Sequence, residues 1–255
     1  MQSFLITGHR GAAGLAPENT LPSFKKAVEY DVDFIELDVR ATKDRVLVVI
    51  HDKKLDRTTN GSGFVNEKTF EEIRKLDAGS WFSKEFAGIK IPTLKEVLEF
   101  LKSKSPHIII EIKDAGIEKE VMKVVKETDV LDKIVIASFD LGILLNIRKL
   151  NREIPLLAIS NQYSQAFVKA ILKIGVRIYA LRKDAITEKI VKYCHLKGIL
   201  VNAWVINSVK DAIKMLKMNV DMISTDFPNI MCKFRKILSQ KIADVLENVD
   251  EVFLP

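Results

Sequence analysis

The sequence predicts an α/β protein of the (β/α)8 class, a TIM barrel with a small insertion after the second strand. Two observations favour this fold. Short β-branched runs alternate with amphipathic helical stretches along most of the chain, and eight strand–helix units suffice to close a parallel barrel. The length of 255 residues suits one domain over residues 1–255. An open, doubly wound sheet is the alternative, but no GxGxxG motif follows the first strand.

The predicted strands are short and rich in isoleucine, valine and leucine. They lie at 4–8, 33–39, 107–112, 133–139, 154–160, 177–181, 200–206 and 221–226. Helical stretches, whose apolar residues recur at spacings of three and four, lie at 22–30, 118–128, 141–151, 164–175 and 207–218. Because the carboxyl ends of parallel barrel strands share one face, polar residues that end several strands are expected to meet there.

One segment departs from this alternation. Residues 45–52, "RVLVVIHD", either extend the second strand or fold back on it as a hairpin. Residues 53–91 are rich in turn residues and carry the aromatic side chains Trp81, Phe82 and Phe86. Loops of this length in a compact domain are usually functional or form a small subdomain. In a barrel, such an insertion after a strand is expected over the C-terminal face, where active sites are built.

Composition and charge narrow the class of protein. The net charge is +6, but the lysines alternate with acids on the predicted helices, which favours a solvated surface over a nucleic-acid interface. Cys194 and Cys232 lack metal-binding spacing and are expected to be reduced. No signal-peptide pattern and no apolar run of about 18 residues is present, so we expect a cytoplasmic protein without stable membrane insertion.

The C-terminal stretch, residues 229–255, has the pattern of a long amphipathic helix. We expect it to be the last packing helix of the barrel, with a possible extension. A membrane or dimer contact is the alternative for this stretch. The sequence leaves the choice between monomer and homodimer open.

Acidic residues on two neighbouring strands indicate a metal site. In "FIELDVRA", alternation places Glu36 and Asp38 on the same side of the strand, where two carboxylates repel unless they are protonated or bridged by a cation. In "IIIEIK", Glu111 and Lys113 repeat the arrangement. Three convergent carboxylates suit Mg2+ or Ca2+. Salt-bridged polar residues of the barrel are the alternative, but four charges at neighbouring strand ends favour the metal site.

Two histidines end strand-like runs beside these acids. His9 ends the first strand and His51 ends "RVLVVIHD". A single histidine after an apolar run is commonly a hydrogen-bonded core residue, but a pair of imidazoles can act as acid and base at physiological pH. Arg10 and Lys113 add positive charge to the same region. This set suits a phosphate ester, whose reaction concentrates negative charge on its non-bridging oxygens.

The remaining candidates have simpler interpretations. His107 starts a strand, and His195 lies in a helix beside Cys194, so neither is expected to be functional. Phe139 and Trp204 end two strands and either fill the barrel or line a small organic pocket. Asp226, in "STDFP", is expected to be a structural cap or to support another site residue.

Eight blocks of this sequence resemble, in the same order, those of glycerophosphodiester phosphodiesterases. The resemblance spans residues 4–228, and its first three blocks are the most specific. The blocks are "GHRGAAGLAPENT", "FIELDVRATKD", "VVIHDKKLDRTTNGSG", "IPTLKEVL", "EIK", "ASF", "WVIN" and "STDFP". The resemblance implies a (β/α)8 barrel with a small insertion after the second strand, in agreement with residues 53–91.

The resemblance also implies roles for the residues already named. The ligands of one divalent cation, Mg2+ or Ca2+ with Mn2+ also possible, would be Glu36, Asp38 and Glu111. The acid–base pair would be His9 and His51. The phosphate of a small-molecule glycerophosphodiester would be held by Arg10 and Lys113, with Phe139 and Trp204 as further candidates for substrate contact. In this family a glycine is common where Asp31 or Val32 stands, and another where Arg45 stands; both positions concern turns.

The expected reaction has two displacements at phosphorus. One histidine takes the proton of the glycerol 2-hydroxyl, which attacks the phosphate, while the other protonates the departing alcohol. Water then opens the cyclic phosphate to give glycerol 3-phosphate. Two alternatives remain: lysophospholipase D activity, for which the aromatic residues of 53–91 could supply an apolar rim, and a non-catalytic phosphodiester-binding barrel, which would normally lack one of the histidines or carboxylates.

Overall fold

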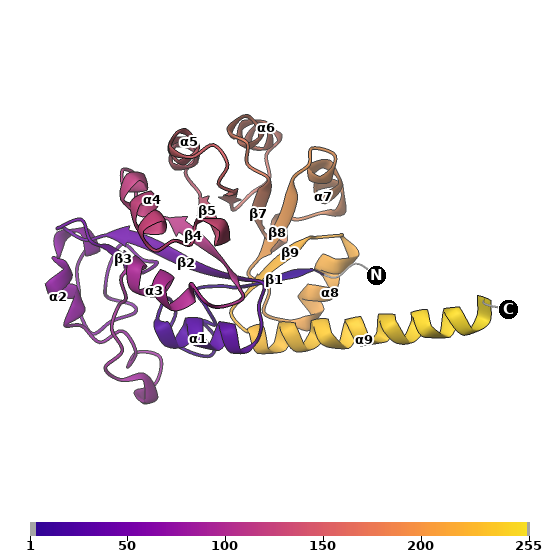
Figure 1. Cartoon of the computed structure of the whole chain (residues 1–255), viewed down its shortest axis with the longest axis horizontal. Helices are drawn as coiled ribbons and strands as arrows, with labels where there is room; N and C mark the ends of the chain where they lie inside the picture. Colours follow the sequence, from indigo (N-terminus) through magenta and orange to yellow (C-terminus); the bar gives the residue numbers. More distant parts are fainter. Residues whose placement is uncertain (1–3, 254–255) are drawn as a thin grey trace.

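A computed structural model describes the backbone of residues 4–253 and the side chains of residues 4–240. Its sheet has the strand order β1-β9-β8-β7-β6-β5-β4-β2-β3, and an added β1–β2 pairing closes the eight parallel strands into a barrel. The parallel strands are β1 (Leu5–Gly8), β2 (Phe34–Ala41), β4 (His107–Ile112), β5 (Ile134–Ser138), β6 (Leu156–Ser160), β7 (Ile178–Arg182), β8 (Leu200–Trp204) and β9 (Met222–Thr225). The predicted TIM barrel is thereby confirmed (Figure 1).

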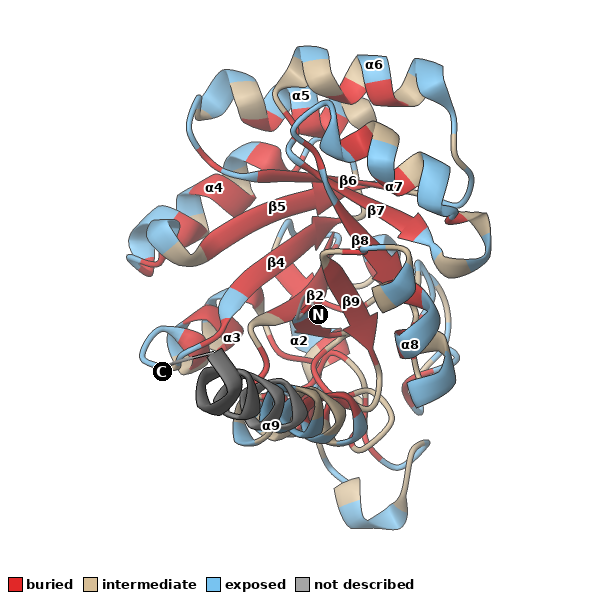
Figure 2. Cartoon of the chain, turned by 90° about the vertical axis from the view of Figure 1, so that its right-hand side faces the viewer, coloured by how far each residue is buried: buried red, intermediate tan, exposed pale blue. Residues whose placement is uncertain are grey.

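Helices surround the barrel and bury one side against it, as Figure 2 shows by the red inner and blue outer sides of the ribbons. They are α1 (Leu21–Glu29), α2 (Phe70–Arg74), α3 (Leu94–Leu101), α4 (Glu118–Glu127), α5 (Leu141–Leu150), α6 (Gln165–Ile174), α7 (Glu188–His195), α8 (Val209–Lys217) and α9 (Pro228–Phe253). Short 3-10 turns are η1 (Val65–Glu67), η2 (Lys84–Phe86), η3 (Leu131–Lys133) and η4 (Lys183–Ala185). Cys194 and Cys232 are buried free thiols, as expected, and burial raises the pKa of each to about 11.

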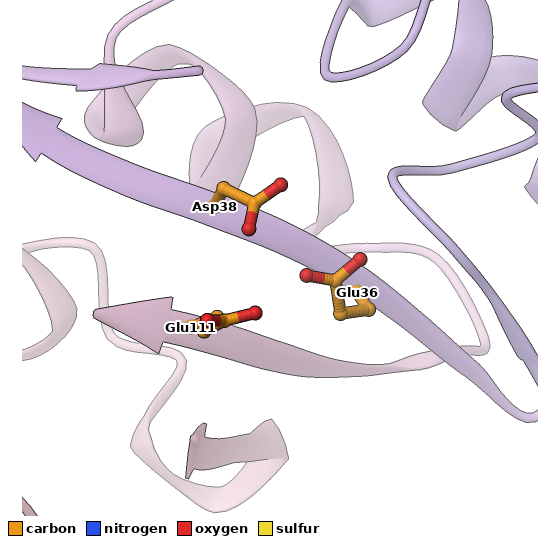
Figure 3. A group of neighbouring side chains, drawn as sticks. All are labelled: Glu36, Asp38 and Glu111. Carbon is orange, nitrogen blue, oxygen red and sulfur yellow. The ribbon is translucent and has the colours of Figure 1, made fainter. Parts of the chain in front are cut away.

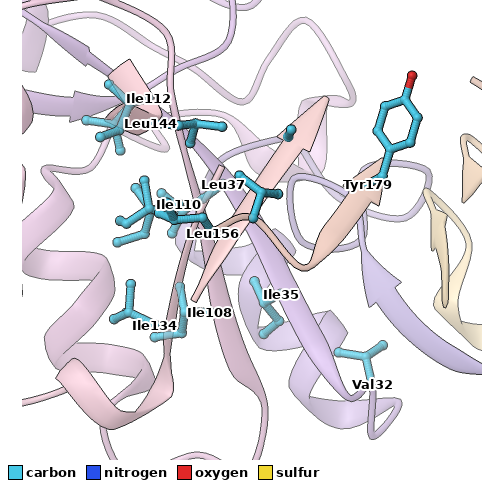
Figure 4. Close-up of a cluster of buried hydrophobic side chains, with 14 of the residues drawn as sticks. Val32, Ile35, Leu37, Ile108, Ile110, Ile112, Ile134, Leu144, Leu156 and Tyr179 are labelled. Carbon is cyan, nitrogen blue, oxygen red and sulfur yellow. The ribbon is translucent and has the colours of Figure 1, made fainter. Parts of the chain in front are cut away.

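Alternation along the strands divides the apolar residues between two cores. Ile35 and Leu37 of β2 belong to the larger core, which also contains helix residues and therefore lies between the sheet and the helices (Figure 4). The smaller core contains only strand residues and therefore fills the barrel. Its buried members are Ile109, Val135, Ala137, Leu157, Ile159, Ile178, Ala180 and Met222. Residues that lie on the same side of their strands as these, such as Glu36 and Asp38, consequently face the barrel axis.

The hairpin alternative is the correct one for residues 45–52. Strand β3 (Leu47–Val49) pairs antiparallel with β2, with Val39 opposite Val49. The chain reverses at Arg45, whose φ of 65° is left-handed. Because the chain runs back along β2, the backbone N–H of Ile50 donates to the carbonyl of Asp38 at 3.0 Å, and His51 follows at once.

The segment after β3 has an apolar cluster of its own. Its buried members are Val48, Ile50, Leu55, Val65, Ile73, Ala78 and Ile91. Helix α2 begins in this segment with a capping box, in which Thr69 and Glu72 satisfy each other's free backbone N–H groups. Trp81, Phe82 and Phe86 stack edge to face in sequence, at centroid distances of 5.7 Å. These contacts give an otherwise loop-rich segment a defined structure.

Both positions at which the family commonly has glycine are left-handed in this chain, since Asp31 has a φ of 59° and Arg45 one of 65°. Asp31, and not Val32, has the positive φ in the turn before β2. We expect Asp31→Gly to raise the free energy of unfolding by up to about 1 kcal/mol, because glycine adopts this φ without the steric cost of a Cβ. A rise in Tm in differential scanning calorimetry would confirm this. Asp132→Gly, within η3, is the control and should lower Tm; a fall in both variants would contradict the prediction.

Helix α9 packs against the first strand at its beginning. The rings of Phe4 and Phe234 lie 6.3 Å apart, and Arg235 forms an ion pair with Asp33. The first turns of α9 therefore have the predicted packing role. The side chains beyond residue 240 and the last two residues of the predicted stretch 229–255 lie outside the described part. Among the described residues, no helix is both long and apolar enough to cross a membrane.

Candidate active site

Several predicted site residues, together with Asp226, end strands on the same face of the barrel. Each side chain faces the barrel axis. Side chains alternate along a strand, and the residues next to these positions point outward, or the residue two positions earlier belongs to the inner core. The residues on this face are His9 after β1, Glu36 and Asp38 of β2, Glu111 of β4, Phe139 after β5, Trp204 of β8 and Asp226 after β9. Strand register places Asp38 directly beside Glu111. The barrel thus brings together residues that are up to 217 positions apart.

Three carboxylates form the centre of the site. Glu36, Asp38 and Glu111 each offer an oxygen within 4.8 Å of the others, and all three side chains are buried (Figure 3). Asp38 is the deepest, with 1% of its surface exposed. Its Oδ2 accepts a hydrogen bond from Asn19 Nδ2 at 2.8 Å, whereas its Oδ1 has no hydrogen-bond partner. Buried like charges at this spacing require compensation.

The carboxylates divide the negative charge unequally. Burial and the charges of Asp38 and Glu111 raise the pKa of Glu36 well above its ordinary value. Burial and Asp38 likewise raise the pKa of Glu111 to about 7, although Lys113 opposes the shift. Burial also disfavours the charged form of Asp38, but Lys113 and Arg10 outweigh it and lower the pKa to about 2. In the metal-free site Asp38 therefore holds its charge most firmly.

Two cations lie against these acids. The backbone N–H of Arg10 donates to Glu36 Oε2 at 2.8 Å, and its guanidinium Nε lies 3.5 Å from Asp38 Oδ2. Lys113 Nζ donates to Glu111 Oε1 at 2.7 Å and lies 3.3 Å from Asp38 Oδ1. Both side chains are largely buried, so their charges act in a medium of reduced dielectric constant. The site therefore offers positive groups to an anion beside a carboxylate cluster.

His9 is oriented by Asp226, at 2.7 Å between Nδ1 and Oδ1. Asp226 also accepts from Asn207 Nδ2 at 2.6 Å. Burial disfavours the Asp226 carboxylate, but the hydrogen bond and charge of His9, the hydrogen bond from Asn207 and the charge of Arg10 together outweigh it and lower the pKa, so the carboxylate accepts and Nδ1 donates. This assignment leaves His9 Nε2 as the ring atom available to exchange a proton.

His51 is held in the same way by Asp52, at 2.6 Å between Nδ1 and Oδ1. Hydrogen bonds from Arg57 and His51 lower the pKa of Asp52, which therefore accepts the Nδ1 proton. The carbonyl of His51 accepts from Arg40 Nε at 2.8 Å, and Arg40 pairs in turn with Asp114. Burial lowers the pKa of His51 itself. Backbone and ring are both fixed, and Nε2 is again the available nitrogen.

Aromatic side chains flank the charged groups on one side. The rings of Phe139 and Trp204 meet edge to face at a centroid distance of 5.9 Å. Lys113 Nζ lies 5.6 Å from the centroid of Phe139, which links this pair to the carboxylates. Phe139 is 41% exposed, while Trp204 Nε1 is a buried donor without a hydrogen-bond partner. Trp204 also packs against the inner core, so its ring joins the barrel interior to the site.

The family model for the glycerophosphoryl diester phosphodiesterase family matches residues 9–230 of this chain. The chain belongs to this family. It is accordingly a phosphodiesterase, an enzyme that hydrolyses phosphoric diesters.

Relatives and a solved structure match this chain over most of its length and most of their own. The chain is 40% identical over 235 residues to a glycerophosphodiester phosphodiesterase of Caldanaerobacter subterraneus, which covers 89% of this chain and 96% of that one. It is 35% identical over 240 residues to one of Bacillus altitudinis, covering 91% and 98%. A phosphodiesterase of Oleispira antarctica in complex with the product sn-glycerol-3-phosphate superimposes with a TM-score of 0.82 at 27% identity, covering 93% and 96%.

Several site contacts of this phosphodiesterase were not predicted from the sequence. Asp226 was expected to be a cap or a supporting acid, and its partner His9 was not identified. Glu18 and Arg57 were not singled out at all, although both lie within the blocks that resemble the family. Asp52 was available as a signal, because it directly follows His51. Of the two histidines interpreted as ordinary, His107 packs against the ring of Phe34, and His195 pairs with Asp221.

Proposed function

We propose that this enzyme hydrolyses glycerophosphodiesters to glycerol 3-phosphate and an alcohol, with a divalent cation and two histidines as acid and base. The observation that carries the proposal is that His9, His51, Arg10 and Lys113 lie around the cluster of Glu36, Asp38 and Glu111. The product complex of the Oleispira relative supports glycerol 3-phosphate as the product.

The carboxylates suit a hard cation. The donor set is oxygen alone, which matches Mg2+ or Ca2+ and, less selectively, Mn2+. Asp38 Oδ1 is buried without a hydrogen-bond partner, and burial together with the charge of Asp38 raises the pKa values of Glu36 and Glu111, a strain that a bound cation would relieve. Glu36, Asp38 and Glu111 would hold the ion, and when bound it supplies positive charge to the non-bridging oxygens of the phosphate.

The two imidazoles carry the proton transfers of the first step. One Nε2 takes the proton of the glycerol 2-hydroxyl, whose oxygen forms a bond to phosphorus as the bond to the alcohol oxygen breaks. The other imidazole, protonated, donates its proton to that oxygen, so the alcohol leaves neutral and a cyclic phosphate of glycerol remains. Asp226 and Asp52 stabilise the imidazolium form that each ring passes through.

In the second step water opens the cyclic phosphate, and the two imidazoles exchange their roles as proton acceptor and proton donor. One imidazole takes a proton from water, whose oxygen bonds to phosphorus, and the other returns a proton to the 2-oxygen as the ring opens. Arg10 and Lys113 hold the phosphate oxygens throughout. Phe139 and Trp204 line the side of the site on which the organic part of the substrate lies, and the free Nε1–H of Trp204 is a donor for it.

The test is release of glycerol 3-phosphate from glycerophosphocholine and glycerophosphoethanolamine by metal-stripped enzyme, with Mg2+, Mn2+ or Ca2+ added back. Product that forms only with metal, and not in Glu36→Ala, supports the cation site and the substrate class together. Product that forms without any metal would contradict the requirement for a cation. Hydrolysis of lysophosphatidylcholine alone would show that lysophospholipids, and not glycerophosphodiesters, are the substrates.

A further inference from the structure

Arg57, in the segment after β3, binds two carboxylates at once. Its Nε and Nη2 donate to Asp52 at 2.7 and 3.1 Å. Its Nη1 and Nη2 donate to Glu18 at 2.8 and 2.7 Å. Two edges of the planar guanidinium are therefore engaged, each in a two-point contact. A lysine ammonium has no such planar fork and cannot reproduce this geometry.

Each of these carboxylates also binds a residue of the site. Asp52 Oδ1 lies 2.6 Å from His51 Nδ1, and Glu18 Oε1 accepts from Arg10 Nη1 at 2.7 Å. A continuous chain of contacts therefore runs from His51 through Asp52, Arg57 and Glu18 to Arg10. Its two halves come from different parts of the sequence, the loop between β1 and α1 and the segment after β3. Arg57 is the joint between them.

Stability alone is a weak reason for this arrangement. The Arg57 side chain is 44% exposed, and exposed ion pairs typically contribute about 0–1 kcal/mol to stability. Glu18 is largely buried and already has Arg10 as a counter-charge. The Arg74–Glu96 pair has the same two-point geometry and a similar exposure, with no contact to the site. It is therefore a matched comparison for a purely structural arginine.

We propose that Arg57 is a positioning residue, which fixes the imidazole of His51 relative to the guanidinium of Arg10 by holding Asp52 and Glu18 together. The proposal rests on the proposed roles of His51 in proton transfer and of Arg10 in phosphate binding. The imidazole must reach an atom attached to the phosphate that Arg10 holds, so an error in their separation affects the chemical step. Substrate binding, which Arg10 and Lys113 retain, is affected less.

Steady-state kinetics of Arg57→Ala and Arg57→Lys on glycerophosphocholine test this, with Arg74→Ala and Arg74→Lys as controls. We expect both Arg57 variants to lose kcat by about 10- to 100-fold, since a displacement near 1 Å has effects of this size, while KM changes much less. Guanidinium chloride at millimolar concentration should restore part of the kcat of Arg57→Ala. The Arg74 variants should keep their kcat. Wild-type kcat in Arg57→Lys, or equal losses in the Arg57 and Arg74 variants, would overturn the proposal.

Nitrogen-15 NMR of the imidazoles reports the position of His51 independently of activity. The chain has four histidines, so each ring can be assigned by substitution. In Arg57→Ala we expect the His51 Nδ1–H signal to weaken and the ring to populate both tautomers; an unchanged signal contradicts the proposal.

The double variant His51→Ala/Arg57→Ala separates this proposal from the proposed function. It should be no less active than His51→Ala alone, and a further loss equal to that of Arg57→Ala would mean that Arg57 acts elsewhere. Full activity in His51→Ala would instead refute the role of His51 in the reaction, whatever the NMR result.

Discussion

Substitution of His51 by alanine should lower kcat on glycerophosphocholine by about 10²- to 10⁴-fold, the usual contribution of a general acid or base. His9→Ala should have an effect of the same order, because the proposed reaction needs one ring to accept a proton while the other donates. The structure gives both rings the same arrangement, with Nδ1 bound to an aspartate and Nε2 free. Initial-rate assays of glycerol 3-phosphate release, with circular dichroism to verify folding, measure the effect.

His195→Ala is the matched control for both variants. His195 is also a partly exposed histidine paired with an aspartate, Asp221, at 2.8 Å, but it lies at the end of α7 and contacts none of the site residues. Its substitution should leave kcat unchanged. Near-normal turnover in His9→Ala or His51→Ala would remove that residue from the acid–base pair.

Metal addition should stabilise the stripped enzyme, and more strongly at high pH. At a concentration near 100 times Kd the expected gain is about 2.7 kcal/mol, or a rise in Tm of about 5–10 °C. The folded-state pKa of Glu111, about 7 without metal, lies above its unfolded value, so this residue favours the folded state at low pH. That contribution is lost as the pH rises from about 4.5 through 7. A bound cation replaces the proton, and the rise in Tm should therefore grow from pH 5 to pH 8.

Differential scanning fluorimetry with Mg2+, Ca2+ and EDTA at the two pH values measures this effect. Asp38→Asn should abolish the metal-dependent rise, because it removes a ligand charge without changing the size of the side chain. Glu120→Gln, an exposed acid of α4, is the control and should retain it. An equal rise at pH 5 and pH 8, or a full rise in Asp38→Asn, would show that the ion binds elsewhere.

The barrel and the carboxylate cluster could be predicted because both follow from alternation along single strands. Glu36 and Asp38 share a side of β2 by periodicity alone. In β4, Glu111 follows Ile109 by two positions on the inward side, and Ile108, Ile110 and Ile112 face outward. The hairpin at β3 stayed undecided, since "RVLVVI" fits an extended strand as well as a reversed one. The reversal of the chain depends on the left-handed φ at Arg45. Glycine at this position would have indicated such a turn in the sequence, whereas arginine does not.

The contacts that orient the site residues could not be predicted in the same way. The pairing of His9 with Asp226 depends on β1 lying beside β9, and that of Glu18 with Arg57 on a contact between the loop after β1 and the segment after β3. Such pairs are set by closure of the whole sheet. Asp52 was the exception, because its neighbour His51 is adjacent in sequence. Local pattern thus identified the candidate site residues, while the contacts that support them required the three-dimensional structure.

The pairing of the first strand with the last has a consequence for the protein during its synthesis. His9 leaves the ribosome early, but Asp226, which sets its tautomer, is translated 217 residues later. Until β9 enters the gap between β8 and β1, His9 lacks the aspartate that orients its ring. With the proposed role of His9, hydrolytic activity should therefore begin only when β9 pairs with β1 and closes the barrel.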